Sequence, residues 1–250
     1  MRRLVDRFVA KAASSESFPE LSYAISEAAV ELGFSFFALV HHRAVDLQSG
    51  SFIRLHNYPT AWVEQRKKLV MQFEDPVHQA SRHTNVAFAW RDIGSVVALS
   101  RKQRDLLEAS SRFGIGEGLT VPVNIPGEPA GSVSFATRRG DKLMTQSLQS
   151  AYIIGAYAFD TARRLYGPMT HLERPHLSRR EVQCVRLVAI GKTDWEIAKI
   201  LGISFETVRQ YLKHARRSYG VVTRTQLVVA ALRDDWISLD EVALSPAFRN

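Results

Sequence analysis

The sequence predicts an α+β protein, in which an N-terminal α/β/α sandwich with an antiparallel sheet precedes an all-α C-terminal domain of four helices. Helical and strand patterns are mixed in residues 1–166, whereas residues 177–237 carry helical patterns and no strand pattern. Between them, residues 167–176 contain two prolines and a glycine, which mark breaks between elements. We therefore expect two domains joined by that linker, and a tail over 238–250 to which no structure is assigned.

Two amphipathic helices are expected at the N-terminus. Residues 18–32 carry apolar side chains at helical spacing, and Gly33 follows them, as is typical of a helix end. The preceding segment has the same spacing, and Asp6, Arg7 and Lys11 interrupt any apolar run in it. That pattern predicts a packing helix and argues against a secretion signal.

The expected strands lie farther along the N-terminal domain. Residues 34–42 are aromatic and apolar, as in a buried strand, and residues 50–58 alternate well enough to form its neighbour. Residues 118–137 carry two strand patterns around a Pro/Gly turn, which predicts a hairpin. A helix that opens with a Ser100–Gln103 capping box is expected over 100–114. Helices that flank hairpin-connected strands indicate layers around an antiparallel sheet.

The composition excludes several classes of protein. With 46% hydrophobic residues the chain has ample material for a core, and its longest apolar runs, such as 228–232, are far shorter than the roughly 20 residues of a membrane span. A single cysteine, Cys184, excludes an internal disulfide framework and a cysteine-rich zinc site, and favours a reducing cytoplasm. No metal or cofactor is expected. His41 and His42 indicate a strand end and not a metal site, because no further ligand lies at a suitable spacing. Residues 114–118 are rich in glycine and indicate a loop. They do not indicate a nucleotide site, because such a fingerprint requires a preceding strand and none is expected there.

Helix start and stop signals divide the C-terminal domain. Capping boxes at Ser178–Glu181 and Thr193–Glu196 each begin a helix, and Gly191 ends the first of them. Gly202 then breaks the chain, and Ser204 caps the next helix. Two helices joined by a tight turn that contains glycine are typical of a helix-turn-helix motif.

The helix expected over 203–220 is strongly basic. One stripe of apolar side chains must face the core, namely Val208, Leu212, Ala215 and Tyr219. Four cations therefore point sideways or outward, namely Arg209, Lys213, Arg216 and Arg217. A solvated face would explain one basic helix, but not the capped helix and glycine turn before it. Residues 177–237 also hold eleven Lys and Arg against six Asp and Glu, a net charge of +5 out of +8 for the chain, which favours a polyanionic partner.

Double-stranded DNA is the partner that this arrangement favours. Arg209 and Lys213 lie one turn apart in the half of the helix that enters the major groove in such motifs. Arginine can bond guanine through two atoms, and cations farther along the helix would hold phosphates without distinguishing bases. The candidate DNA-binding residues are Arg209, Lys213, Gln210, Arg216, Arg217, Ser204 and Thr207.

Residues 56–77 of the N-terminal domain suggest a small-molecule site. Tyr58 and Trp62 are four residues apart and share a helix face if Pro59 occupies the first helical position. Their hydroxyl and indole donors, together with the acceptor Asp75, complement a small molecule with two carbonyls and one N–H. A structural interpretation remains open at this point, since the aromatic residues could belong to a core and Asp75 could cap a helix that begins at Pro76.

The C-terminal domain resembles the four-helix DNA-binding domain of LuxR-type transcriptional regulators. The matching positions include Glu181, Gly191, the "GKT" after it, and the "EIA", "LGIS" and "TVR" motifs. The resemblance implies that Arg209 and Lys213 contact bases and that the last helix, "RTQLVVAALRDD", pairs two copies of the chain. Val185 departs from the usual leucine, which affects only a core methylene.

The N-terminal domain resembles the acyl-homoserine-lactone domain of LuxR-type quorum sensors. The pattern is Tyr-Pro, Trp, a later aromatic residue and Asp-Pro, with Trp90 and Gly118 at matching spacings. By this resemblance Trp62 donates to the lactone carbonyl and Tyr58 to the amide carbonyl, while Asp75 accepts from the amide N–H. Ser134 matches a position that often adds a hydroxyl contact. The candidate ligand-binding residues are Tyr58, Trp62, Asp75, Trp90, Ser134 and Arg66.

Arg66 is a departure, because that family usually has tyrosine four residues after the tryptophan. We expect its guanidinium to extend outward to solvent. Two alternatives stay open, namely pairing with a carboxylate and packing against an aromatic acyl group of the ligand. Either alternative would fit an oxygenated or aromatic ligand, or a signal that is not a lactone.

The expected function is that of a cytoplasmic, homodimeric transcriptional regulator of quorum sensing that binds an N-acyl-homoserine lactone and a two-fold DNA operator. A receptor for a different small molecule is the first alternative. An enzyme acting on lactones or amides is disfavoured, because the sequence shows no nucleophile–base pair and no metal-ligand set.

Overall fold

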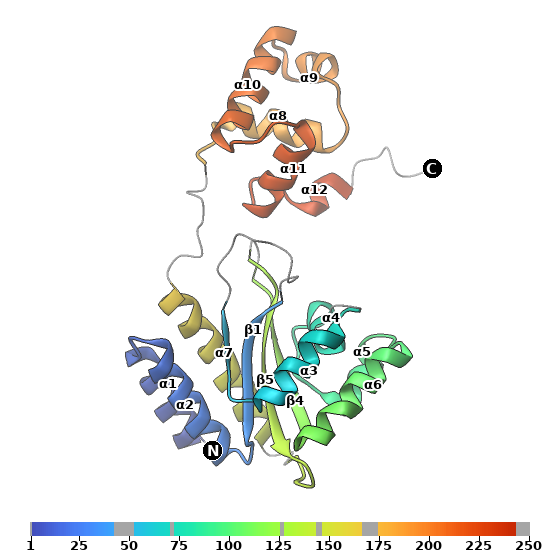
Figure 1. Cartoon of the computed structure of the whole chain (residues 1–250). Coiled ribbons are helices and arrows are strands. Elements are labelled where there is room, and N and C mark those ends of the chain that lie inside the picture. The colour runs from blue at the N-terminus through green and yellow to red at the C-terminus, as the bar shows by residue number, and fades with distance from the viewer. Residues whose placement is uncertain are drawn as a thin grey trace. The chain divides into compact units, whose positions relative to one another are not determined.

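The computed structural model describes residues 2–42, 53–70, 73–125, 128–143, 147–166 and 175–243. The chain divides into two compact units, residues 1–169 and residues 170–250 (Figure 1). Each unit has its own hydrophobic core.

An antiparallel sheet forms the centre of the N-terminal unit. Its strands are β1 (Phe36–His41), β2 (Arg54–His56), β3 (Phe88–Ala89), β4 (Ile115–Val123) and β5 (Gly131–Arg138). Over the described residues the spatial order is β2-β1-β5-β4-β3, and every neighbouring pair is antiparallel. The expected hairpin is β4 and β5.

Helices cover both faces of this sheet (Figure 1). One layer consists of α1 (Arg2–Ser14), α2 (Phe18–Glu31) and α7 (Leu148–Tyr166). The other consists of α3 (Thr60–Val70), α4 (Pro76–His83), α5 (Ile93–Val96) and α6 (Arg101–Ala109), with short 3₁₀ turns at Trp90–Asp92 and Ser110–Phe113. The predicted α/β/α sandwich is therefore confirmed.

The two faces of the sheet differ in polarity, because successive side chains of a strand point to opposite sides. Phe37, Val133 and Phe135 are fully buried toward α1, α2 and α7. Each such side chain contributes about 1.5–3 kcal/mol through burial. Ser132 and Ser134, on the opposite face of β5, line a pocket beneath α3 and α4.

Three elements of this unit differ in part from those expected. Residues 114–118 were expected to form a loop, but most of them belong to a strand. Gly114 takes a left-handed conformation (φ 80°), and β4 begins at the next residue. The pairing of β4 with β5 has a register shift between Ile115 and Gly118. Helix α3 begins at Thr60 rather than Pro59. Part of the strand expected over 50–58 lies outside the described residues, and β2 accounts for the remainder.

The C-terminal unit contains α8 (Arg179–Ala189), α9 (Asp194–Leu201), α10 (Phe205–Ser218), α11 (Arg224–Arg233) and the short α12 (Leu239–Ala243). The first four are the helices that the sequence predicts. Helix α12 was not predicted and lies in the tail, where Ser238 caps it and Glu241 pairs with Arg186 of α8 at 3.0 Å.

The predicted caps position the two helices of the turn motif. Both capping boxes are formed, and Gly202 ends α9 in a left-handed conformation (φ 64°). Ser204 begins α10, its hydroxyl oxygen accepting from the Thr207 N–H at 3.0 Å. Val208, Leu212 and Ala215 are buried, and Tyr219, the fourth residue of the expected stripe, is half-buried against the same core, so the stripe orients α10 as predicted.

No helix among the described residues is long and apolar enough to cross a membrane. Across the same residues no group of three or more His, Cys, Asp or Glu side chains could hold a metal ion.

Candidate ligand pocket and nucleic-acid interface

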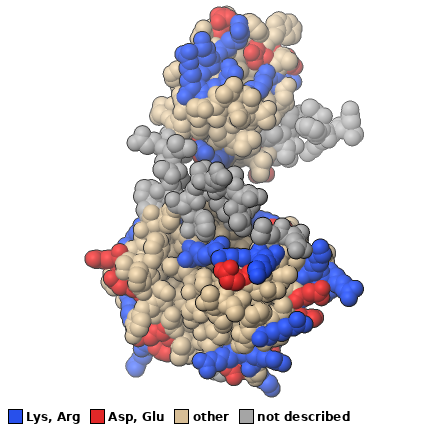
Figure 2. All heavy atoms as spheres, viewed as in Figure 1, with Lys and Arg blue, Asp and Glu red and all other residues tan. Residues whose placement is uncertain are grey.

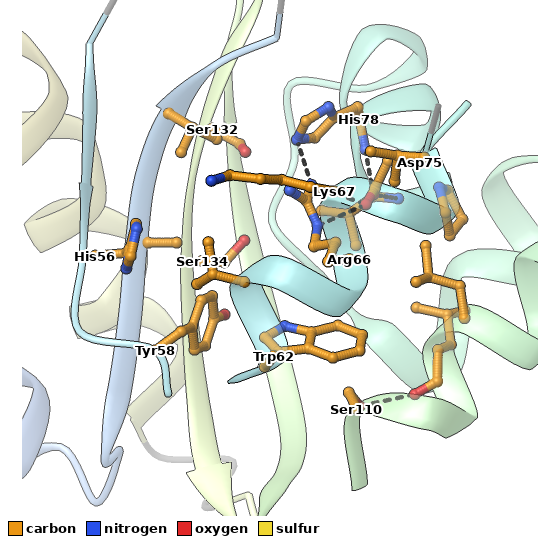
Figure 3. A pocket seen from close by; sticks show the side chains of 18 of the residues that line it. His56, Tyr58, Trp62, Arg66, Lys67, Asp75, His78, Ser110, Ser132 and Ser134 are labelled. Atoms are coloured by element: carbon orange, nitrogen blue, oxygen red, sulfur yellow. Dashed lines mark hydrogen bonds and ion pairs between the residues drawn. The ribbon is translucent and has the colours of Figure 1, made fainter. Parts of the chain in front are cut away.

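A pocket lies between the β2–β1–β5 face of the sheet and the helices α3, α4 and α6 (Figure 3). It leaves ≈ 110 Å³ to the centres of water-sized molecules, several times the space that one water needs. All six candidate ligand-binding residues line it, although they come from separate segments. They are Tyr58, Trp62, Arg66, Asp75, Trp90 and Ser134.

Tyr58 and Trp62 form the aromatic end of the pocket. Trp62 is buried in an apolar cluster with Leu106, Ile115 and Ala136, and its ring lies 5.5 Å from that of Phe113. Burial raises the pKa of Tyr58, so its phenol stays protonated at physiological pH. Within the described part of the chain, neither the Tyr58 hydroxyl nor the Trp62 indole N–H has a hydrogen-bond partner. Both donors are therefore available to a bound molecule.

Asp75 is both a helix cap and a pocket residue. Its Oδ1 accepts from the backbone N–H groups of Val77 at 2.8 Å and His78 at 3.3 Å, at the start of α4. The structural interpretation of Asp75-Pro76 is thus confirmed, and it does not remove Asp75 from the pocket. Burial alone would raise the pKa of this carboxyl, but the adjacent Arg66 guanidinium and the cap hydrogen bonds lower it to about 2.

The expectation that Arg66 extends outward to solvent is wrong. Its Nε donates to Asp75 Oδ2 at 2.9 Å, its Nη2 lies 2.8 Å from the same oxygen in an ion pair, and Nη2 donates to His78 Nε2 at 3.0 Å (Figure 3). The Asp75 side chain is only 5% exposed, and a buried carboxylate is strongly unfavourable without a cationic partner. The carboxylate pairing left open by the sequence is therefore the one adopted.

A second polar group, formed by His78, His42 and Ser132, adjoins this pair and was not predicted from the sequence. A guanidinium only donates, so His78 Nε2 must accept and the ring must be neutral. The His78 ring stacks on His42 at 3.9 Å between centroids, and His42 Nε2 lies 2.8 Å from Ser132 Oγ. Burial lowers the pKa of His78 to about 4 and that of His42 to about 2. One clue was present in the sequence, since Ser132 is two residues before Ser134 and so shares its face of β5.

Trp90 and Ser134 are linked through Thr120. The Trp90 Nε1 donates to Thr120 Oγ1 at 2.9 Å, and that hydroxyl lies 2.8 Å from Ser134 Oγ. The Trp90 ring covers Gly118 so closely that a Cβ there would lie 2.4 Å from ring carbons. The spacing of Trp90 and Gly118 noted in the sequence therefore corresponds to a direct contact.

Three basic residues of α10 line a depression on the C-terminal unit together with Arg224, namely Arg209, Lys213 and Arg216. In Figure 2 the Lys and Arg side chains group on one part of that unit's surface, around α10. Arg209, Lys213 and Arg217 are exposed, as predicted. Glu206 contacts Arg209 at 3.4 Å and Gln210 at 3.2 Å, so it holds two of the candidate side chains in place.

Other candidates on this helix also have structural roles. Arg216 is half-buried, and its Nη1 donates to the Val222 carbonyl at 2.9 Å, joining α10 to the segment before α11. Arg224, which sequence reasoning did not select, donates to the Lys192 carbonyl at 3.0 Å. The hydroxyls of Ser204 and Thr207 lie 2.7 Å apart at the start of α10.

Comparison with known families divides the chain in the same way. Residues 17–164 match the family described as autoinducer binding domain, and residues 175–231 match the bacterial regulatory proteins of the luxR family.

Individual relatives are distant. The transcriptional activator TraR of Rhizobium radiobacter is 24% identical over 240 residues, which cover 93% of this chain and 98% of TraR. The HTH-type regulator y4qH of Sinorhizobium fredii is 26% identical over 191 residues, which span 76% of this chain but only 59% of y4qH. A solved structure of SdiA in complex with octanoyl-rac-glycerol superposes with a TM-score of 0.66 at 23% identity, covering 92% of this chain and 93% of SdiA. At that identity the likeness establishes the fold.

Proposed function

This chain belongs to the LuxR family of autoinducer-binding transcriptional regulators, and from that premise we propose that a small acylated signal controls its binding to DNA. The observation that carries the proposal is the convergence of Tyr58, Trp62, Arg66, Asp75, Trp90 and Ser134 on one pocket. A pocket with an apolar wall and a few placed polar groups is what a small-molecule site needs.

One ligand class is an N-acyl-homoserine lactone, which the family resemblance implies. The Trp62 indole would donate to the lactone carbonyl and the Tyr58 hydroxyl to the amide carbonyl, as the family resemblance implies. The apolar cluster around Trp62, which includes Leu106, would pack against the acyl chain.

A second ligand class is an acylated molecule without the lactone amide. The pairing of Arg66 with Asp75 favours it, because the carboxylate is already engaged. The relative SdiA has been solved in complex with such a molecule, octanoyl-rac-glycerol, which is an acyl ester without nitrogen.

Binding of ligand would stabilise the folded N-terminal unit by mass action. The active species would be a homodimer that places two α10 helices about one DNA turn apart on a two-fold operator. Arg209 and Lys213 would contact bases, and Arg217 and its neighbours would contact phosphates. Helix α11 would contribute to pairing the two copies, and the protein would act in the cytoplasm, where its operator lies.

The decisive experiment measures binding of the full chain to promoter fragments and to random duplex by fluorescence anisotropy. It is run with and without acyl lactones and acyl esters, over a series of salt concentrations. We expect a ligand-dependent preference for specific fragments and affinity that falls with salt. Equal affinity for all duplexes with every ligand would contradict the proposal, as would conversion of the ligands to products.

A further inference from the structure

We infer that the pocket selects an acylated ligand whose head group offers hydrogen-bond acceptors and no amide N–H, and that Arg66 sets this preference. The inference rests on the proposed function, since it concerns the ligand of the same pocket.

An ionised carboxylate has about four lone-pair positions for hydrogen bonds. Asp75 Oδ1 receives two backbone donors, the N–H groups of Val77 and His78. Asp75 Oδ2 accepts from Arg66 Nε at 2.9 Å and lies 2.8 Å from the charged Nη2 in the same ion pair. Three hydrogen bonds and the ion-pair contact with Nη2 therefore surround the two oxygens, and the amide N–H of a ligand would have to compete with Arg66 for Oδ2.

Displacement of Arg66 is unfavourable. The guanidinium carries a full positive charge, whereas a ligand amide is neutral, and charge-assisted hydrogen bonds are about twice as strong as neutral ones. The Asp75 side chain is 5% exposed and that of Arg66 is 29% exposed, so water screens the pair only weakly. Arg66 is also held by His78 Nε2 at 3.0 Å, which can act only as an acceptor toward it. An N–H donor would break this arrangement without replacing its charge.

The polar atoms that remain are suited to acceptors on the ligand. The Arg66 Nη1 carries two hydrogens and, among the described residues, has no hydrogen-bond partner. The Tyr58 hydroxyl and the Trp62 indole N–H supply two further donors in the same pocket. A head group with ester, ketone or carboxylate oxygens would meet these donors, while its acyl chain meets the apolar cluster around Trp62.

The test compares two ligands that differ in one group. One is an N-acyl-homoserine lactone, and the other is the matching O-acyl ester of α-hydroxy-γ-butyrolactone, in which an ester oxygen replaces the amide N–H. Dissociation constants are measured by isothermal titration calorimetry on the full-length chain, over a series of acyl lengths. We expect the ester to bind at least as tightly as the amide. An amide that binds about tenfold tighter or more would overturn the inference and leave the proposed function standing.

Two variants on α3 make the test specific to Arg66. Arg66→Met frees Asp75 Oδ2 for the amide N–H. We therefore expect the affinity for the amide, relative to that for the ester, to rise about tenfold or more. Lys68→Met removes a cation from the same helix at an exposed position that does not line the pocket, and it should leave the ratio unchanged. An unchanged ratio in Arg66→Met would overturn the inference.

The remaining outcomes are also decisive. If Arg66→Met fails to fold, the ratio measured on the unsubstituted chain decides by itself. If neither ligand binds at any acyl length, the proposed ligand class fails, and this inference fails with it.

Discussion

Arg66 and Asp75 join the first two helices of the layer that covers the pocket, with Nε of the guanidinium donating to Asp75 Oδ2 at 2.9 Å and Nη2 lying 2.8 Å from the same oxygen. Arg66 lies in α3 and Asp75 caps α4, so the pair fixes how these helices approach each other. Asp75 therefore has a charged partner that belongs to the protein itself. The N-terminal unit then does not depend on a ligand to compensate this buried carboxylate.

Loss of Arg66 should destabilise the ligand-free protein. Removing one partner of a fully buried pair costs roughly 3–5 kcal/mol. Because Arg66 keeps some contact with solvent, we expect about 2 kcal/mol for Arg66→Met, measured as the free energy of unfolding in urea. Lys68→Met should change that free energy by less than about 0.5 kcal/mol. Equal stabilities of the two variants would show that the ion pair contributes little.

The contact between Trp90 and Gly118 makes the glycine position sensitive to a single methyl group. A Cβ at residue 118 would lie 2.4 Å from the Trp90 ring carbons, so the indole would have to move. We expect Gly118→Ala to destabilise the N-terminal unit by about 1–3 kcal/mol in thermal or urea unfolding. Gly94→Ala is a matched control, because a Cβ there would meet nothing within 4 Å. Similar effects of the two substitutions would contradict the steric explanation.

The stacked histidines predict a loss of stability in mild acid. Unfolded histidine binds its proton near pH 6.5, whereas folded His78 and His42 stay neutral down to pKa values of about 4 and about 2. As the pH falls below 6.5 the unfolded chain therefore binds more protons than the folded one, and the free energy of unfolding decreases. The slope should reach at most about 1.4 kcal/mol per pH unit for each histidine. Asp75, whose folded pKa is lowered to about 2 from 3.8, extends the loss to still lower pH.

Urea unfolding at several pH values between 7 and 4 measures this slope. His78→Gln removes one of the two histidines that take up a proton on unfolding, and it keeps an acceptor for Arg66. The free energy of unfolding of this variant should therefore fall less steeply as the pH is lowered. His83→Gln, at an exposed position at the end of the same helix, should follow the unsubstituted chain. Identical slopes in all three proteins would exclude His78 as a source of the acid sensitivity.

The fold could be predicted from the sequence because its signals are local, whereas the pocket residues were assigned by the family resemblance, since their own pattern left a structural interpretation open. Strand alternation, capping boxes and the glycine turn act over a few residues, and the structure follows them closely. The direction of Arg66 could not be predicted in this way. It depends on how deeply Asp75, nine residues away, is buried, and burial is a property of the packed sheet and helices. The His42–His78 stack joins residues thirty-six positions apart and has no local pattern at all.

Two arginines of α10 should affect DNA binding differently. Arg209 lies in the half of the helix that enters the major groove in such motifs, where it can bond guanine, whereas Arg217 lies near the C-terminal end. We expect Arg209→Ala to cost about 1–3 kcal/mol on the specific operator and to relax the preference at one base position.

Arg217→Ala is the matched control on the same helix. A phosphate contact carries no sequence information, so this variant should weaken binding to all duplexes alike and reduce the slope of log K against log salt by about 1. Anisotropy titrations against operator and single-base variants, at several salt concentrations, distinguish the two effects. Uniform weakening by Arg209→Ala would assign that residue to phosphate contact and move base recognition to other side chains, with Lys213 and Gln210 the next to substitute.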